Sequence, residues 1–223
     1  SLRIRKDEIS LLEPPFYLIG LGISSKGLYD EPNIPKKEYL EDIKAANEHA
    51  AMSSVRDNRT YDFLSGIGIT KHVITGCPAT FLFNRKFDLK NNGPVLLTFP
   101  FPVVKGNDNK KFGEIIELTK QLVDYFKNKG LTPIISCHDD RDVPPAQEIF
   151  PSEQIFFSNY ARDYFPVYED ASLVIGTRLH ASILASGMGK PFLNINLDSR
   201  GLGFSETFNM QEWNINFEGN TVF

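Results

Sequence analysis

The sequence predicts an α/β fold with parallel sheets, and three observations support this prediction. Short apolar runs alternate with amphipathic segments along most of the chain. Several of these runs end at glycine or at small turn-forming residues, as buried parallel strands do. The amphipathic segments between them have the spacing of helices. Strands that alternate with helices are typical of βαβ units, in which ligands bind at the carboxyl ends of the strands.

In the first half of the chain, the apolar runs are short and the helical spacing is clear in one segment. Leu40, Ile43 and Ala46 recur at helical intervals, which predicts a helix over 39–52. The other elements expected in this half are strands at 16–23, 54–57 and 72–75 and a helix at 60–65.

The second half repeats the alternation. Ile115, Leu118 and Leu122 lie on one face of a predicted helix at 114–129, and Gly130 follows as its C-cap. The remaining expected elements are strands at 95–99, 132–137, 154–157, 173–176 and 191–195 and a helix at 178–188. A cluster of polar turn-forming residues at 88–93 separates the halves. We therefore expect an N-terminal lobe at 1–90 and a C-terminal lobe at 91–223.

Composition narrows the class of protein. The chain has 223 residues and a formal net charge of −4, which argues against nucleic acid as a partner. Its two cysteines, Cys77 and Cys137, form no C-x-x-C pair, so we expect reduced thiols in a cytoplasmic protein. No apolar run reaches the length of a membrane-spanning helix. The spacing of His138, Asp139, Asp140 and Asp142 fits no metal motif, and we expect neither a metal nor another cofactor.

The most informative segment follows the strand expected at 173–176. Thr177 is a good N-cap residue, and Arg178 and His180 would lie in the first turn of the next helix. A helix N-terminus favours an anion, and the guanidinium of Arg178 would add further donors. This arrangement suits a phosphate or carboxylate ligand. The alternative is an ordinary ion pair beside a structural histidine, and residue chemistry alone leaves both open.

This segment resembles the Arg-Leu-His block of polysaccharide pyruvyl transferases. The match runs from Gly176 to Ser182 and continues with Gly189 and Pro191. The family carries a lysine twenty residues after its histidine, and Arg200 occupies that position here, which replaces a point charge with a planar fork. Three further blocks, at 17–23, 53–57 and 75–79, resemble the family in the right order. The resemblance covers 16–206, and the Gly-Asn-x-Gly-Asp turn with which the family opens is not found upstream of it.

The resemblance implies two Rossmann-like lobes of the glycosyltransferase-B type, with parallel sheets, helices on both faces and an incomplete first lobe. It implies phosphoenolpyruvate as donor, a carbohydrate acceptor (including a lipid-linked one) and a pyruvate ketal as product. We expect the protein to act in the cytoplasm, at the inner face of the cell membrane. We also expect it to form a homo-oligomer. The expected roles are an acid or base at His180 and donor binding by Thr177, Arg178, Arg200 and Arg56.

His138 is a second candidate for the catalytic base, because it follows the strand expected at 132–137. The alternative is that it belongs to a solvated acidic loop. Two other functions stay open at this point. One is a glycosyltransferase that uses a nucleotide sugar, and the other is a non-catalytic carbohydrate-binding relative.

Overall fold

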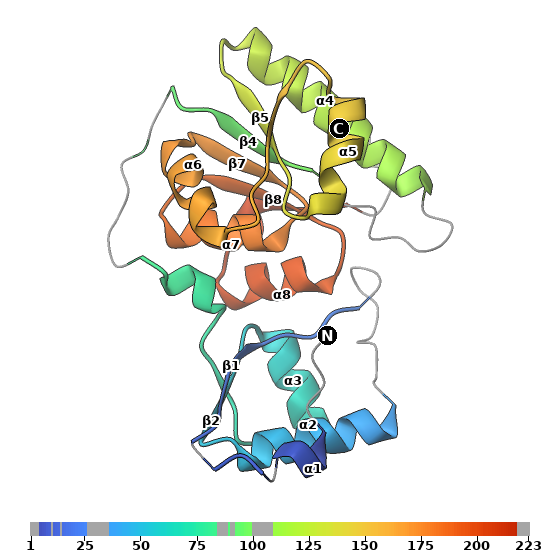
Figure 1. The fold of residues 1–223 in the computed structure, drawn as a ribbon, viewed down its shortest axis with the longest axis vertical. Helices are drawn as coiled ribbons and strands as arrows, with labels where there is room; N and C mark the ends of the chain where they lie inside the picture. Colours follow the sequence, from blue (N-terminus) through green and yellow to red (C-terminus); the bar gives the residue numbers. More distant parts are fainter. Residues whose placement is uncertain are drawn as a thin grey trace. The chain divides into compact units, whose positions relative to one another are not determined.

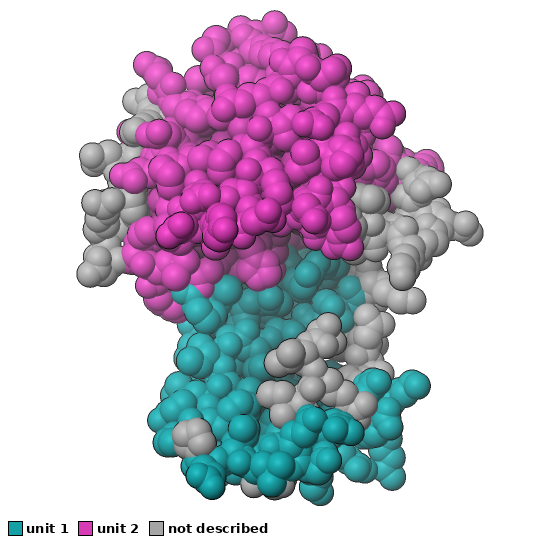
Figure 2. Space-filling view, in the orientation of Figure 1, with its two compact units in different colours: residues 1–78, 198–212 teal, residues 79–197, 213–223 magenta. Residues whose placement is uncertain are grey.

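The computed structural model describes residues 5–9, 11–13, 15–25, 36–83, 89, 92–99 and 109–217. The chain forms two compact units, coloured separately in Figure 2: Ser1–Pro78 with Asp198–Glu212, and Ala79–Leu197 with Trp213–Phe223. The sequence-based division into 1–90 and 91–223 does not include the return of 198–212 to the first unit. Half of the polar cluster that suggested that division, residues 88, 90 and 91, lies outside the described residues.

The second unit contains a six-stranded sheet in the order β6-β5-β4-β7-β8-β9, in which every neighbouring pair is parallel. Numbered along this unit, the order is 3-2-1-4-5-6, which is the arrangement of doubly wound nucleotide-binding folds. The strands are β4 (Val95–Thr98), β5 (Pro133–Ser136), β6 (Gln154–Phe156), β7 (Leu173–Gly176), β8 (Phe192–Asn196) and β9 (Asn214–Asn216). The predicted α/β fold with parallel sheets is confirmed.

Helices cover both faces of this sheet (Figure 1). They are α4 (Asn109–Asn128), α5 (Val143–Ile149), α6 (Tyr164–Asp170) and α7 (Leu179–Gly187). On one face, Val95, Leu97 and Phe99 pack with Ile115 and Phe126 of α4 in a single apolar cluster. Side chains alternate along a strand, so Leu96, which is fully buried, faces the opposite side. A strand buried on both faces explains why β4 reads as an uninterrupted apolar run.

The first unit contains a smaller parallel sheet in the order β1-β2-β3. Its elements are α1 (Lys6–Ile9), β1 (Tyr17–Leu21), α2 (Lys37–His49), β2 (Met52–Val55), α3 (Asn58–Gly66), β3 (Val73–Ile74) and α8 (Ser199–Thr207). A small core of Val55, Leu64 and Ile69 lies between this sheet and its helices. Tyr17 and Ile19, which alternate with the inward residues of β1, are more than half exposed.

Two of the hydrogen bonds that join helix α8 to the rest of the first unit are made by its first and last residues. The backbone N–H of Ser25 donates to the hydroxyl of Ser199 at 3.0 Å, and the backbone N–H of Asn58 donates to that of Thr207 at 2.9 Å. Gly203 lies where any added Cβ would meet the Asp57 carboxyl carbon at 3.0 Å. The close approach of α8 to the start of α3 therefore depends on a glycine.

Candidate functional site

The topology of the second unit identifies one place where a ligand is expected. From β4 the chain continues through α4 to β5 on one side, and β7 continues through α7 to β8 on the other. In open α/β sheets, ligands bind outside the carboxyl ends of the strands where the order reverses in this way. Here that point lies between the end of β4 and the end of β7, where Thr98 and Gly176 are paired.

Gly176 permits the chain to leave β7 close to β4. Its φ is 151°, and a Cβ at this position would lie 1.8 Å from the Thr98 hydroxyl oxygen. Neither the backbone conformation nor the space is compatible with a larger residue. Two residues later, the backbone N–H of Arg178 donates to the same hydroxyl at 3.4 Å. The glycine therefore brings Arg178 to the switch point.

The Arg178 side chain is held from two other strand ends. Its Nη2 donates to both carboxylate oxygens of Asp142, at 2.7 and 2.6 Å, and its Nε donates to the carbonyl of Phe99 at 3.4 Å. Phe99 follows β4, and Asp142 lies in the turn after β5. The Asp142 side chain is completely buried, whereas 23% of the Arg178 side chain is exposed. The Arg178 side chain is thus partly exposed while its guanidinium is held at two points.

The pair is electrostatically asymmetric. Burial raises the pKa of the Asp142 carboxyl above its usual range, and the positive charge of Arg178 opposes that shift. The double contact at short distance is typical of an ionised carboxylate bound to arginine. Removing either member would leave a buried charge without its partner.

Helix α7 starts one residue later than the sequence predicts. The N-cap is Arg178, with φ −87° and ψ 99°, and not Thr177. The expectation that Thr177 caps the helix is therefore wrong. The Thr98 hydroxyl, a long-range partner that the local sequence cannot reveal, supplies the acceptor for the Arg178 N–H. His180 does lie in the first turn of α7, as predicted, and it is exposed.

His138 follows β5 and belongs to the same side-chain network. Its backbone N–H donates to Asp142 Oδ2 at 3.2 Å, and its ring Nε2 lies 3.2 Å from the Tyr168 hydroxyl. The ring centroid lies 5.2 Å from that of Tyr164. Burial, together with the smaller effect of the positive charges of Arg178 and His180, lowers the pKa of His138 to about 4. His138 is therefore neutral at pH 7.

Sequence reasoning missed Asp142 and Tyr168 as members of this site. Asp142 had been grouped with the neighbouring acidic residues as a loop. Its position was nevertheless informative, because the carboxyl ends of adjacent parallel strands meet at one edge of the sheet. In the parts of the chain that the structure describes, no group of three or more His, Cys, Asp or Glu side chains is arranged to hold a metal ion.

In the first unit, Arg56 follows β2 and is almost completely buried, with 7% of its surface exposed. Its Nε donates to Asp57 Oδ2 at 3.1 Å. Its Nη2 is buried and has no hydrogen-bond partner among the described residues. A Cβ on Gly22 would lie 2.6 Å from this nitrogen. A buried guanidinium nitrogen without an acceptor is costly, and a bound anion is one way to satisfy it.

Arg200 is also part of the first unit, in the first turn of α8. Its Nε donates to both carboxylate oxygens of Asp198 at 3.0 Å, and its Nη2 donates to Oδ2 at 2.5 Å. Asp198 also caps α8 by accepting the Arg200 N–H at 2.9 Å. These bonds raise the pKa of the Arg200 guanidinium. The arginine in the family's lysine position is thus anchored to its own helix cap.

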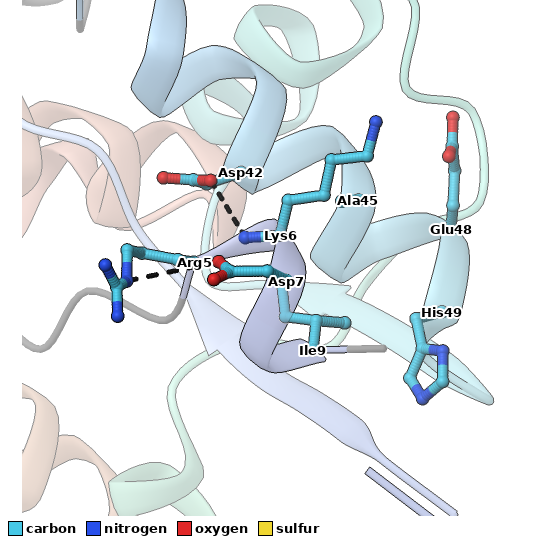
Figure 3. Close-up of a pocket in the computed structure, with 8 residues that line it drawn as sticks. All are labelled: Arg5, Lys6, Asp7, Ile9, Asp42, Ala45, Glu48 and His49. Carbon is cyan, nitrogen blue, oxygen red and sulfur yellow. Dashed lines mark hydrogen bonds and ion pairs between the residues drawn. The ribbon is translucent and has the colours of Figure 1, made fainter. Parts of the chain in front are cut away.

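An open groove lies elsewhere, beside α1 and α2 (Figure 3). Its polar groups contact one another: the Lys6 backbone N–H donates to Asp42 at 3.0 Å, and Arg5 Nε lies 4.0 Å from Asp7 Oδ1. None of the site residues expected from the sequence lines it. The groove therefore adds nothing to the switch-point site.

Solved structures similar to this chain share its fold. An MnaA–UDP co-structure from S. aureus has a TM-score of 0.53 and 18% identity, and covers 81% of this chain and 51% of its own. A UDP-GlcNAc 2-epimerase from Neisseria meningitidis bound to UDP-GlcNAc has a TM-score of 0.52 and 14% identity, and covers 81% and 52%. This chain thus spans about half the length of those proteins. At such identities the likeness shows the glycosyltransferase-B-like fold alone.

No curated protein is a significant match to the sequence. The family model for polysaccharide pyruvyl transferase matches residues 10–199. That range includes the strand ends that carry Arg56, His138 and Arg178. The chain belongs to the polysaccharide pyruvyl transferase family.

Proposed function

We propose that the protein transfers the enolpyruvyl unit of phosphoenolpyruvate to two hydroxyl groups of a carbohydrate. In this reaction the methylene carbon of the donor gains a proton and becomes a methyl group. Both hydroxyl oxygens bond to the central carbon, the bond from that carbon to the phosphate oxygen breaks, and inorganic phosphate leaves with the second hydroxyl proton. The product is a pyruvate ketal. Such a reaction needs cations for two anionic groups, an acid for the methylene carbon and a base for the hydroxyl protons.

The fixed guanidinium of Arg178 at the switch point is the observation that carries this proposal. Phosphoenolpyruvate has a carboxylate and a phosphate, and the charged N–H donors of a guanidinium bind either group strongly. Arg178 is held by side-chain and backbone acceptors but still reaches solvent. Thr177, which precedes it at the end of β7, is a proposed donor contact. Preorganised charge of this kind stabilises a transition state without a reorganisation cost.

The two histidines fit different roles. We assign the acid to His180, which is exposed in the first turn of α7, because histidine is the residue type most often used for proton transfer near neutral pH. His138 is neutral at pH 7, because its pKa is lowered to about 4. A neutral imidazole accepts a proton or a hydrogen bond, so His138 suits the base or an acceptor contact.

Arg56 and Arg200 remain proposed ligands for the anionic groups of the donor. The unpartnered Nη2 of Arg56 supports this role, because a carboxylate or phosphate oxygen would satisfy it. Arg200 is anchored by Asp198 and carries a guanidinium where the family has an ammonium group.

Several coarser properties accompany the proposal. In the described ranges, no helix is long and apolar enough to cross a membrane. A lipid-linked acceptor would bring the reaction to the cytoplasmic face of the membrane, and a homo-oligomer is part of the proposal. Neither a metal nor another cofactor enters the chemistry written above.

Calorimetric titration with phosphoenolpyruvate tests the donor without an acceptor. Saturable binding to the wild-type chain is expected, and Arg178→Lys should weaken it about 10- to 100-fold, because a charged hydrogen bond contributes about 1.5–3 kcal/mol. Arg178→Met/Asp142→Leu removes both members of the buried pair and guards against misfolding of the single variant. Arg141→Ala is the control, since the Arg141 side chain is 67% exposed and lies in the same turn as Asp142.

The same titration decides between the alternatives. UDP-GlcNAc and inorganic phosphate are titrated in parallel. Binding of UDP-GlcNAc but not of phosphoenolpyruvate would support a nucleotide-sugar enzyme and contradict the proposal. Binding of neither would support a non-catalytic relative.

A further inference from the structure

We infer that Asp142 is a positioning residue that fixes the direction of the Arg178 guanidinium and the backbone of His138 together. The inference rests on the proposed function only where the ligand is named. The geometry of the pair is independent of any ligand.

The Asp142 carboxylate accepts three hydrogen bonds. Asp142 accepts two hydrogen bonds from Arg178 Nη2, at 2.7 and 2.6 Å, and one from the His138 backbone N–H at 3.2 Å. Arg178 follows β7 and His138 follows β5, and these strands lie on either side of β4. The carboxylate therefore ties two neighbouring loops together across the strand between them.

The burial of Asp142 limits how it can act. The Asp142 side chain is completely inaccessible, so it acts on a ligand only through the groups it holds. Arg178 keeps 23% of its side chain exposed. With Nη2 directed at Asp142 and Nε at the Phe99 carbonyl, the plane of the guanidinium is fixed at two points.

A neutral replacement of Asp142 would change both the hydrogen bonds and the charge of the site. An amide has one oxygen acceptor, so Asp142→Asn cannot accept from Nη2 at both oxygens. The same substitution removes one negative charge and leaves the site more positive. On charge alone it would strengthen the binding of an anion. If Asp142 positions Arg178, the substitution would instead weaken the binding of the anion, because the guanidinium would no longer be held in one direction.

These opposite directions give the test. Phosphoenolpyruvate is titrated by calorimetry into the wild type, Asp142→Asn and the control Asp140→Asn, which makes the same charge change at an exposed residue of the same turn. We expect a Kd about tenfold higher for Asp142→Asn and an unchanged Kd for Asp140→Asn. A Kd for Asp142→Asn that is equal to or lower than that of the wild type would overturn the inference.

Nitrogen-15 NMR of the arginine side chains in the ligand-free protein gives a readout that does not need phosphoenolpyruvate. The Arg178 signals, assigned through Arg178→Lys, should show hindered guanidinium rotation in the wild type and fast rotation in Asp142→Asn. Arg162, which is 80% exposed, is the internal reference for fast rotation.

The wild-type spectrum keeps the inference testable if Asp142→Asn does not fold. Arg178 rotation as fast as that of Arg162 would refute the positioning role in the wild type itself. If the wild type fails to bind phosphoenolpyruvate but Arg178 is held, the proposed donor is wrong and the positioning role stands.

Discussion

Replacing Gly176 with alanine should strongly destabilise the second unit, and the structure allows the size of the effect to be worked out. The added Cβ would lie 1.8 Å from the Thr98 hydroxyl oxygen and 3.0 Å from the Thr98 backbone nitrogen. Overpacking of this kind costs about 1–3 kcal/mol. The φ of 151° is a region that residues other than glycine rarely adopt, which costs about 1–3 kcal/mol more. The expected loss is about 2–6 kcal/mol in the free energy of unfolding.

Fluorescence of Trp213 during urea unfolding measures this loss, because Trp213 belongs to the second unit. Trp213 is the only tryptophan in the chain, and its ring lies 6.1 Å from that of Phe192 in β8. Gly130→Ala is the matched control, because Gly130 has a φ of 73° but nothing within 4 Å of an added Cβ. Gly176→Ala/Thr98→Ala should recover part of the loss by removing the hydroxyl. A loss for Gly176→Ala within about 1 kcal/mol of the control would refute the close approach of β7 to β4.

Three other perturbations test the remaining features. The pKa of His138 is about 4 in the folded protein, below the unfolded value near 6.5, so the free energy of unfolding of the second unit should fall by about 3 kcal/mol between pH 6.5 and pH 4. Trp213 fluorescence during urea unfolding measures this loss, and His138→Asn should remove most of the pH dependence. Gly22→Ala should destabilise the first unit by about 1–3 kcal/mol through contact with Arg56, measured by hydrogen exchange of α3 amides, whereas Gly66→Ala, with open space at its Cβ, should not. Asp57→Ala should cost about 3–5 kcal/mol by the same measurement, since Asp57 both caps α3 and pairs with buried Arg56, and a loss below 1 kcal/mol would contradict that double role.

Local sequence patterns predicted five of the six strands of the larger sheet. The strand expected at 173–176 is β7, and those expected at 95–99 and 154–157 differ from β4 and β6 by one residue. Strand β9 was missed, because Asn214-Ile215-Asn216 is not an apolar run. It is recognised only in three dimensions, where the Asn196 amide donates to Asn216 at 2.9 Å across the strand pair. The return of α8 to the first unit was missed for the same reason, since long-range hydrogen bonds define it.

The candidate site shows a similar division between local and long-range information. Arg178 and His180 were predicted because a strand end, a helix start and their residue types are adjacent in the sequence. The partner of Arg178 was not predicted, since Asp142 lies 36 positions away and its complete burial has no local signature. The low pKa of His138 depends on burial and on charges from other strand ends, which sequence alone does not reveal.

The most direct test of the central claim is the titration of phosphoenolpyruvate into the wild-type chain and Arg178→Lys at equal ionic strength. The lysine variant keeps the positive charge and loses the planar guanidinium that Asp142 and Phe99 hold. If phosphoenolpyruvate is the donor and Arg178 its ligand, the wild type binds saturably and the variant binds about 10- to 100-fold more weakly. Equal affinity of the two proteins, or no binding by the wild type, would contradict the account.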